Sequence, residues 1–275
     1  MATLCLFCDN NAGSREHLWP KWILARGDYG PLRHQIRKKE AVVIRPEMTI
    51  KTVCQSCNNG WMSKLESECI PVIGSMLQGL SVPLSQEQQE LVSMWAMKTA
   101  MMMDSIKGRD ADKRFYNHDE CEQLRLQRTI PGETRIWLGH NVGEGLGGFG
   151  TDFTAVAVEL GMERVARGMS STIIIGHLSL QVVTVHRFPE HLGRDISDVQ
   201  PKDADWQSQL IQIWPASRYI SWPPKVAFEN EGQLGIGRLM ERWRIGPHVD
   251  DLDSPHQTSG IDPARVTQRS RRERD

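Results

Sequence analysis

Apolar residues between residues 85 and 127 recur at the spacing of one face of a helix. The residues that form this face are Leu91, Trp95, Met97, Met101 and Met102. Ser85 followed by Glu87 and Gln88 resembles a helix start, because a serine hydroxyl can cap the first free backbone N–H groups. We therefore predict that residues 71–130 are a helical segment, with the methionines packed in a core.

From about residue 134 the pattern changes to short runs of β-branched and aromatic residues separated by Gly or Pro. The runs are Thr134–Leu138, Phe153–Leu160, Ser171–Ile175, Leu180–Val185 and Leu210–Trp214. Because no long helix separates these strands, they favour a largely antiparallel sheet. The glycines at 143, 145 and 148 match a dinucleotide-binding fingerprint in spacing, but a strand follows them, so we interpret them as a turn.

These patterns predict an α+β protein in four parts. Residues 1–70 form a module rich in Cys and Trp, residues 71–130 are helical, and residues 131–247 form a mostly β domain of unknown role. Residues 248–275 are polar and are expected to be disordered. No apolar run is long enough to span a bilayer and no signal-peptide pattern is present, so we expect a cytoplasmic protein.

Charge is distributed unevenly along the chain. The net charge is −1, yet residues 1–65 contain ten Lys and Arg against five Asp and Glu. A basic N-terminal module suits a phosphate-rich partner, although a solvated basic face would have the same composition.

Four of the six cysteines form two Cys-x-x-Cys pairs, Cys5 with Cys8 and Cys54 with Cys57. Each pair can place two thiolates on one side of a metal, and two pairs complete a tetrahedral four-sulfur site of the kind that zinc favours. A site closed by four protein ligands has no position for substrate. The sequence therefore predicts a structural zinc ion and reduced thiols.

Two motifs flank this cysteine frame: REHLWPKW at residues 15–22 and CNNGWMSKLE at residues 57–66. An acidic residue and His followed by x-x-Pro, and later Cys-x-x-Cys-Asn leading into a helix, resembles the HNH endonuclease family. The resemblance covers residues 4–66. It implies a ββα-metal fold, treble-clef-like, in which a β-hairpin and one helix surround a catalytic divalent ion.

The resemblance implies roles for three residues: Glu16 and Asn58 as ligands of Mg²⁺ or Mn²⁺, and His17 as general base. The chemistry agrees with the residue types. A hard cation with oxygen ligands stabilises charge on a phosphodiester, and an imidazole with a near-neutral pKa can take a proton from the attacking water. On a regular strand Glu16 and His17 point to opposite faces, so both can serve one site only if the backbone bends.

Two positions differ from the usual family pattern. Glu16 replaces the more common Asp, and Thr49 is the nearest match to an Asn that usually precedes the second knuckle. Taken singly, Glu16–His17 is also typical of a surface pair, and Asn58 of a helix N-cap.

The expected partner is DNA, with RNA not excluded, and cutting both strands would favour a homodimer. Arg33, Arg37, Lys38 and Lys39 lie in the long segment between Leu24 and Arg45 and are candidate phosphate contacts, or else part of a solvated loop. We expect the tryptophans at 19, 22 and 61 to pack rather than to stack on bases, with Trp61 and Leu65 buried together.

The leading hypothesis is a metal-dependent HNH-type endonuclease that hydrolyses DNA. One alternative is a zinc-stabilised nucleic-acid-binding protein that has lost catalysis. Another is an interaction or sensor protein whose C-terminal β domain does the work.

Overall fold

The computed structural model describes residues 3–27, 32–34, 42–44, 49–106, 114–142, 149–160, 163–192, 198–201, 204–229 and 243–246, and all structural statements concern these residues. The elements in chain order are β1 (Leu4–Cys5), β2 (Cys8–Asn11), β3 (Ser14–His17), α1 (Lys21–Leu24), β4 (Leu32–His34), β5 (Val42–Ile44), β6 (Thr49–Val53), α2 (Gln55–Cys57), the π-helical turn η1 (Asn58–Met62), α3 (Ser63–Leu77), β7 (Val82–Leu84), α4 (Gln86–Ile106), α5 (His118–Gln127), β8 (Glu133–His140), β9 (Phe149–Leu160), β10 (Glu163–Ile175), β11 (Leu178–Arg187), the 3₁₀ turn η3 (Pro189–His191), β12 (Asp198–Pro201), α6 (Ala204–Gln209), β13 (Leu210–Trp214), β14 (Ile220–Trp222) and β15 (Trp243–Gly246).

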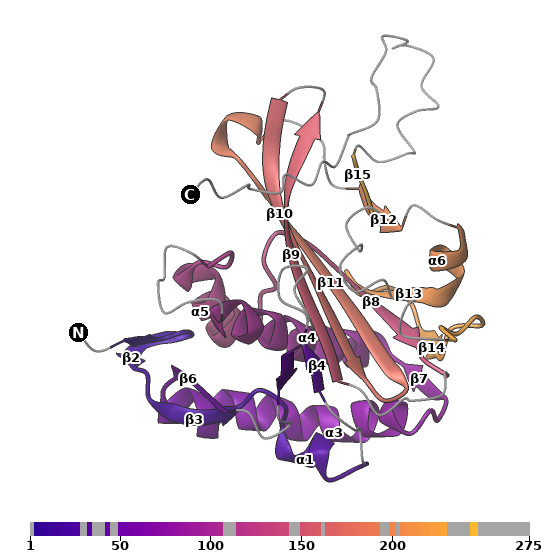
Figure 1. Ribbon diagram of the computed structural model, residues 1–275, viewed down its shortest axis with the longest axis horizontal. Coiled ribbons are helices and arrows are strands. Elements are labelled where there is room, and N and C mark those ends of the chain that lie inside the picture. The colour runs from indigo at the N-terminus through magenta and orange to yellow at the C-terminus, as the bar shows by residue number, and fades with distance from the viewer. Residues whose placement is uncertain are drawn as a thin grey trace.

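A seven-stranded sheet with the order β13-β8-β11-β10-β9-β4-β5 is the largest element of the structure (Figure 1). All five predicted strands lie within it, and neighbouring strands from β13 to β9 run antiparallel, as expected. One pairing differs, because β4 runs parallel to β9. The mixed helix and sheet content confirms the α+β class.

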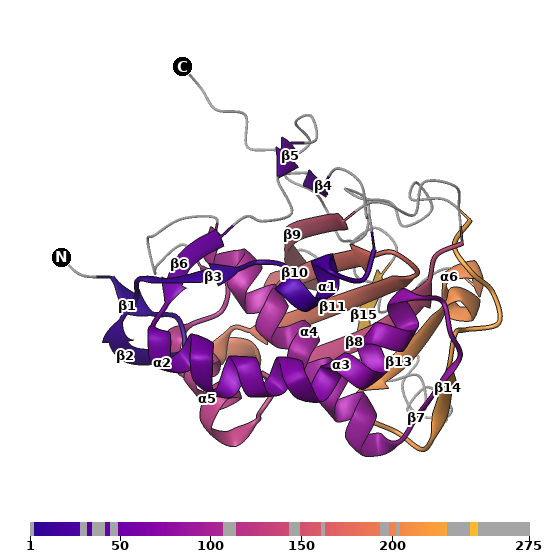
Figure 2. The ribbon, with the colours of Figure 1, turned by 90° about the horizontal axis from the view of Figure 1, so that it is seen from below.

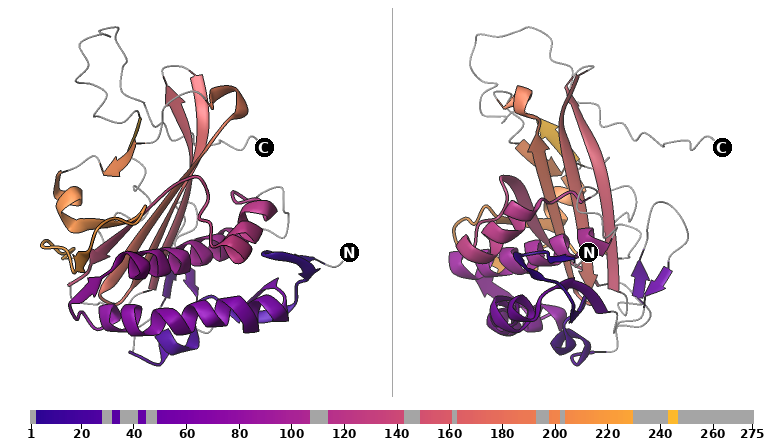
Figure 3. Two further views of the ribbon diagram at one scale, coloured as in Figure 1. Left: turned by 180° about the vertical axis from the view of Figure 1, so that it is seen from behind. Right: turned by 90° about the vertical axis from the view of Figure 1, so that its left-hand side faces the viewer.

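Helix α4 forms the layer next to this sheet (Figures 1 and 3). It is buried around most of its circumference, because the sheet lies on one side while α3 and β6 pack on others. This explains why it contains so few exposed positions for a helix of 21 residues. Met101, Met102 and Met103 are all buried, which confirms the prediction that they pack in the core.

The helix start at Ser85 is confirmed, since the Ser85 hydroxyl accepts from the N–H of Gln88 and the Gln88 side chain accepts from the N–H of Ser85. The helical stretch is interrupted, however. Residues 114–117 are not helical, and Asp104 near the end of α4 accepts from the N–H groups of Phe115 and Tyr116 in this stretch. Helix α5 begins at His118.

The N-terminal module is a hairpin of β3 and β6 followed by α2, η1 and α3. Figure 2 shows the pairs β1–β2 and β3–β6 near α2, at one end of α3. Helix α3 extends to Leu77, past the expected boundary at residue 70, and the division of the chain into four parts stays a prediction. In the described part of the chain, no helix has both the length and the apolar character needed to cross a membrane.

The segment between Leu24 and Arg45 is not wholly a loop, since β4 and β5 lie within it and extend the large sheet. The turn at residues 143–148 and the tail at 248–275 lie outside the described residues.

Candidate metal centres

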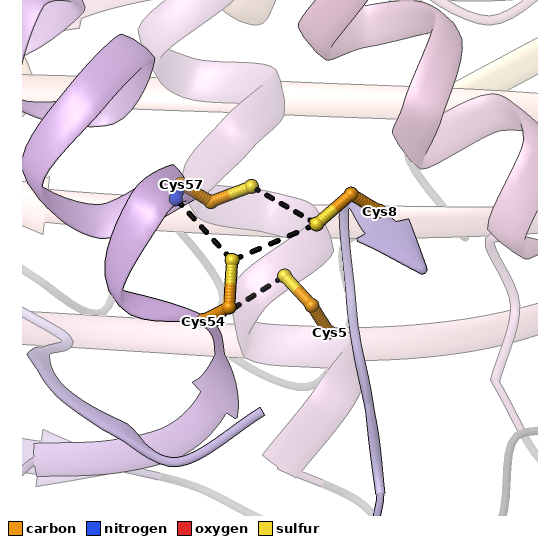
Figure 4. Close-up of side chains that lie close together, drawn as sticks. All are labelled: Cys5, Cys8, Cys54 and Cys57. Atoms are coloured by element: carbon orange, nitrogen blue, oxygen red, sulfur yellow. Dashed lines mark hydrogen bonds between the residues drawn. The ribbon is translucent and has the colours of Figure 1, made fainter. Parts of the chain in front are cut away.

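The side chains of Cys5, Cys8, Cys54 and Cys57 converge at the junction of the two knuckles (Figure 4). Their sulfur atoms all lie within 4.8 Å of one another, and the Sγ of Cys8 is 3.6 Å from that of Cys54 and 3.5 Å from that of Cys57. Four thiolates around one zinc ion at about 2.3 Å would be about 3.8 Å apart. All four residues are buried, so this cluster can hold a metal ion such as zinc.

Backbone N–H groups already point at these sulfurs. The N–H of Cys57 donates to the Sγ of Cys54 at 3.3 Å, and the N–H of Cys54 donates to the Sγ of Cys5 at 3.2 Å. The first of these bonds also caps α2, so Cys54 is both a helix cap and a candidate metal ligand. Bonds of this kind stabilise thiolates and orient them toward a shared cation.

The four thiols cannot all ionise independently. Hydrogen bonding from Cys57 lowers the pKa of Cys5 to about 5, whereas the same contact and then burial raise the pKa of Cys57. Burial also raises the pKa of Cys8. A divalent cation removes this conflict, because it lets every sulfur bind as thiolate.

Glu16 and His17 occupy opposite faces of β3. In the hairpin Glu16 pairs with Ile50 and His17 with Thr49, and the bulge lies before them, between Ser14 and Glu16. Glu16 is 7% exposed and faces the helices, whereas His17 is half-buried. Thr49, the residue nearest to the missing Asn of the motif, therefore lies directly across the hairpin from His17 and is exposed.

Asn58 joins η1 to the hairpin. Its Nδ2 donates to Ser14 Oγ at 2.8 Å and to the carbonyl oxygen of Arg15 at 3.5 Å, so the Asn58 side chain lies against the strand that carries Glu16. Its interpretation as an N-cap is wrong, because Cys54 occupies that position. The structure thus brings Asn58 to the residues directly before Glu16 in β3, although Glu16 and Asn58 are 42 residues apart in the sequence.

Lys98 of α4 and Glu66 of α3 form a buried ion pair, with 2.7 Å between Nζ and Oε1. Burial raises the pKa of Glu16 to about 7, while the positive charge of Lys98 opposes this rise and the negative charge of Glu66 adds to it.

The sequence motifs did not predict the ion pair between Glu66 and Lys98. The available signal for Lys98 was its place among Trp95, Met97 and Met101, where a charged residue interrupts an apolar run. A lysine buried in such a run needs a partner, and Glu66 supplies it.

Of the four candidate phosphate contacts, only Arg33 lies among the described residues. It is in β4, which belongs to the large sheet, whereas residues 37–39 lie outside the described residues. The prediction that the tryptophans pack is confirmed: Trp19 is fully buried, and Trp22 and Trp61 are partly buried against the core. Trp61 packs edge-on against Phe7 of the first knuckle, with ring centroids 4.9 Å apart.

Comparison with models of known protein families, with curated protein sequences and with solved structures gives no match for this chain. Any assignment of function therefore depends on the residues themselves.

Proposed function

We propose that this protein is a metal-dependent endonuclease of the HNH type that hydrolyses phosphodiester bonds in DNA. The observation that carries the proposal is the contact of Asn58 with the strand residues directly before Glu16, beside the four-cysteine cluster, on a hairpin and the helical turn that follows it. This is the arrangement that the ββα-metal resemblance implies.

The two metal centres would have different tasks. The cysteines hold zinc and clamp the base of the hairpin, where the metal contributes folding free energy. Glu16 and the Oδ1 of Asn58 offer oxygen atoms, which suit Mg²⁺ or Mn²⁺. When bound, such an ion would neutralise charge on the phosphate oxygens and on the leaving oxygen.

His17 acts as the general base in this proposal. It is half-buried and thus still reachable from solvent, but it lies on the face of β3 opposite to Glu16, so this role requires the strand to bend when substrate binds. Its imidazole would then take the proton of the attacking water. The exposed Arg15 and Lys21 flank this position and supply positive charge for a phosphate backbone.

Purified full-length protein loaded with zinc tests the proposal. We expect it to nick plasmid DNA with Mg²⁺ or Mn²⁺ and to stop when EDTA removes the second metal. RNA of the same length tests whether both nucleic acids are substrates. Binding that weakens with salt, without cutting in any divalent metal, would contradict the proposal and support a second function.

That second function is binding of nucleic acid without hydrolysis. The deep burial of Glu16, together with Thr49 in place of the usual Asn, favours it. An interaction or sensor protein would instead show no salt-dependent binding to either nucleic acid.

A further inference from the structure

Two histidines lie close together at one end of the large sheet. His140 is the last residue of β8, and His177 lies in the turn between β10 and β11. Their ring centroids are 5.7 Å apart, and both side chains are only partly buried, so solvent still reaches them. Two imidazoles that share one tetrahedral zinc ion have ring centroids about 5.2 Å apart, given the usual zinc–nitrogen distance. The observed separation is therefore close to that of two histidines that bind one ion.

The protonation of the His177 ring is set by its hydrogen bond to the backbone. Its Nδ1 lies 2.9 Å from the carbonyl oxygen of Asn141, and the N–H of Asn141 donates in turn to the carbonyl oxygen of His177. Because a carbonyl oxygen can only accept, Nδ1 carries the hydrogen, and the Nε2 of the neutral ring has a free lone pair. Histidines that bind metals commonly donate their other ring N–H to a backbone carbonyl in this way.

The His140 ring also has the state that a metal requires. It packs edge-on against the buried Trp222, with ring centroids 5.0 Å apart, and its nitrogens form no hydrogen bond with the described residues. Burial, and then the neighbouring His177, lower the pKa of His140. The neutral form is therefore favoured, and this is the form of imidazole that binds metal ions.

The C-terminal end of α3 lies against this pair and favours a cation there. Gly79, in the left-handed turn that ends the helix, has a φ of +73°, and a Cβ at this position would be 3.2 Å from the His177 ring. The N–H of Gly79 donates to the carbonyl oxygen of Met76. Because the last carbonyl groups of a helix carry partial negative charge, they attract a cation to this position.

We propose that His140 and His177 form a second metal site, for a divalent transition-metal ion of the class that prefers imidazole, with water completing its coordination. Zn²⁺ represents this class, whereas Mg²⁺ and Ca²⁺ prefer oxygen ligands. The site shares no residue with the four-cysteine cluster or with the proposed nuclease site, so it does not depend on the proposed function. An ion bound here would tie the end of β8 to the turn between β10 and β11.

The test is calorimetric titration of Zn²⁺ into full-length protein that already holds one zinc ion per chain, in a buffer with excess Mg²⁺. Mg²⁺ occupies sites with oxygen ligands but competes poorly for imidazole. We expect the wild type to bind a second zinc ion. His140→Phe keeps a ring against Trp222, and His177→Gln keeps a donor for the Asn141 carbonyl, yet each removes a metal ligand. Each variant should therefore weaken the second binding event at least about tenfold.

Two control variants show whether the effect belongs to this pair. His118→Ala removes a partly exposed histidine that pairs with Asp9, and it should keep the second affinity within about threefold of the wild type. His17→Ala should do the same, because His17 belongs to the proposed nuclease site. Retention of the first zinc ion and thermal unfolding show that each variant is folded, and His140→Gln replaces His140→Phe if the latter is not.

Loss of affinity in both the His140 and the His177 variants, with both controls unchanged, supports the inference. Absence of a second zinc ion in the wild type overturns it. A loss in only one of the two variants, or an equal loss in His17→Ala or His118→Ala, also overturns it, because the two rings would then not share one ion.

Discussion

Glu16 is a carboxylate placed where its charged form is disfavoured. Burial raises its pKa to about 7 from an ordinary value of 4.5, despite the positive charge of Lys98. The sequence predicted Glu16 and Asn58 because they lie in a motif of fixed spacing. It did not predict Lys98 and Glu66, because their pairing spans 32 residues and depends on how α3 packs on α4.

The burial of Glu16 predicts a pH-dependent difference between the wild type and Glu16→Gln, both zinc-loaded and without Mg²⁺ or Mn²⁺. An acid whose pKa is raised on folding loses stability as pH increases from its unfolded value, 4.5, to about 7. We expect the two proteins to be similarly stable near pH 4.5, and the variant to be more stable above pH 7 by up to about 3 kcal/mol. Urea unfolding across this range measures the difference. A difference that does not change with pH would contradict the burial of an ionisable Glu16.

The cysteine ligands give a second prediction for single side chains. Wild-type protein should bind one zinc ion per chain, and Cys54→Ser should lose it because a tetrahedral site lacks a thiolate and α2 lacks its cap. Cys121→Ala removes a buried thiol outside the cluster and should keep the zinc. Metal analysis by mass spectrometry distinguishes the two, and zinc retained in Cys54→Ser would refute the four-sulfur site.

Among the elements, strands were predicted more accurately than the helical segment. The runs of β-branched residues mark β8, β10 and β11 directly, since these strands form the centre of one sheet. The non-helical residues before α5 were not foreseen, because two of them, Phe115 and Tyr116, are held by Asp104 of α4, 11 and 12 positions earlier in the sequence. Strands β4 and β5 were also missed, since their place in the sheet depends on a parallel pairing with the distant β9.

The N-terminus of α5 is stabilised by a capping box that can be tested by substitution. Asn117 caps the helix, accepting from the N–H of Glu120 while Glu120 accepts from the N–H of Asn117. Asn117→Ala should cost about 1 kcal/mol in chemical unfolding, and Asn117→Gly only a few tenths. Asn117→Ala with the stability of the wild type would indicate that the capping box contributes no stability.

Across the described part of the molecule, most of the buried apolar residues form one continuous core. The cluster joins Leu6 and Leu65 of the N-terminal module to Met97 of α4 and Leu180 of the sheet. Composition suggested separate parts, because cysteines and basic residues concentrate at the N-terminus, but composition does not show which faces pack together. The described module therefore depends on α4 for part of its burial.

A shared core predicts cooperative unfolding. Calorimetry of the zinc-loaded protein should show one transition, with calorimetric and van't Hoff enthalpies that agree. Removing zinc with a chelator should lower the temperature of that single transition. Two separate transitions, only one of which responds to zinc, would show that the module unfolds independently.

The most direct test of the nuclease proposal is the cleavage rate of His17→Ala with Mg²⁺ or Mn²⁺, beside wild type and His118→Ala. His118 is a matched control, because it pairs with Asp9, next to Cys8 of the four-cysteine cluster, and has no proposed part in hydrolysis. Loss of a general base should slow cleavage by about 10²–10⁴-fold while DNA binding and zinc content persist. Cleavage by His17→Ala at the rate of wild type and His118→Ala would show that the hydrolysis does not occur at this site.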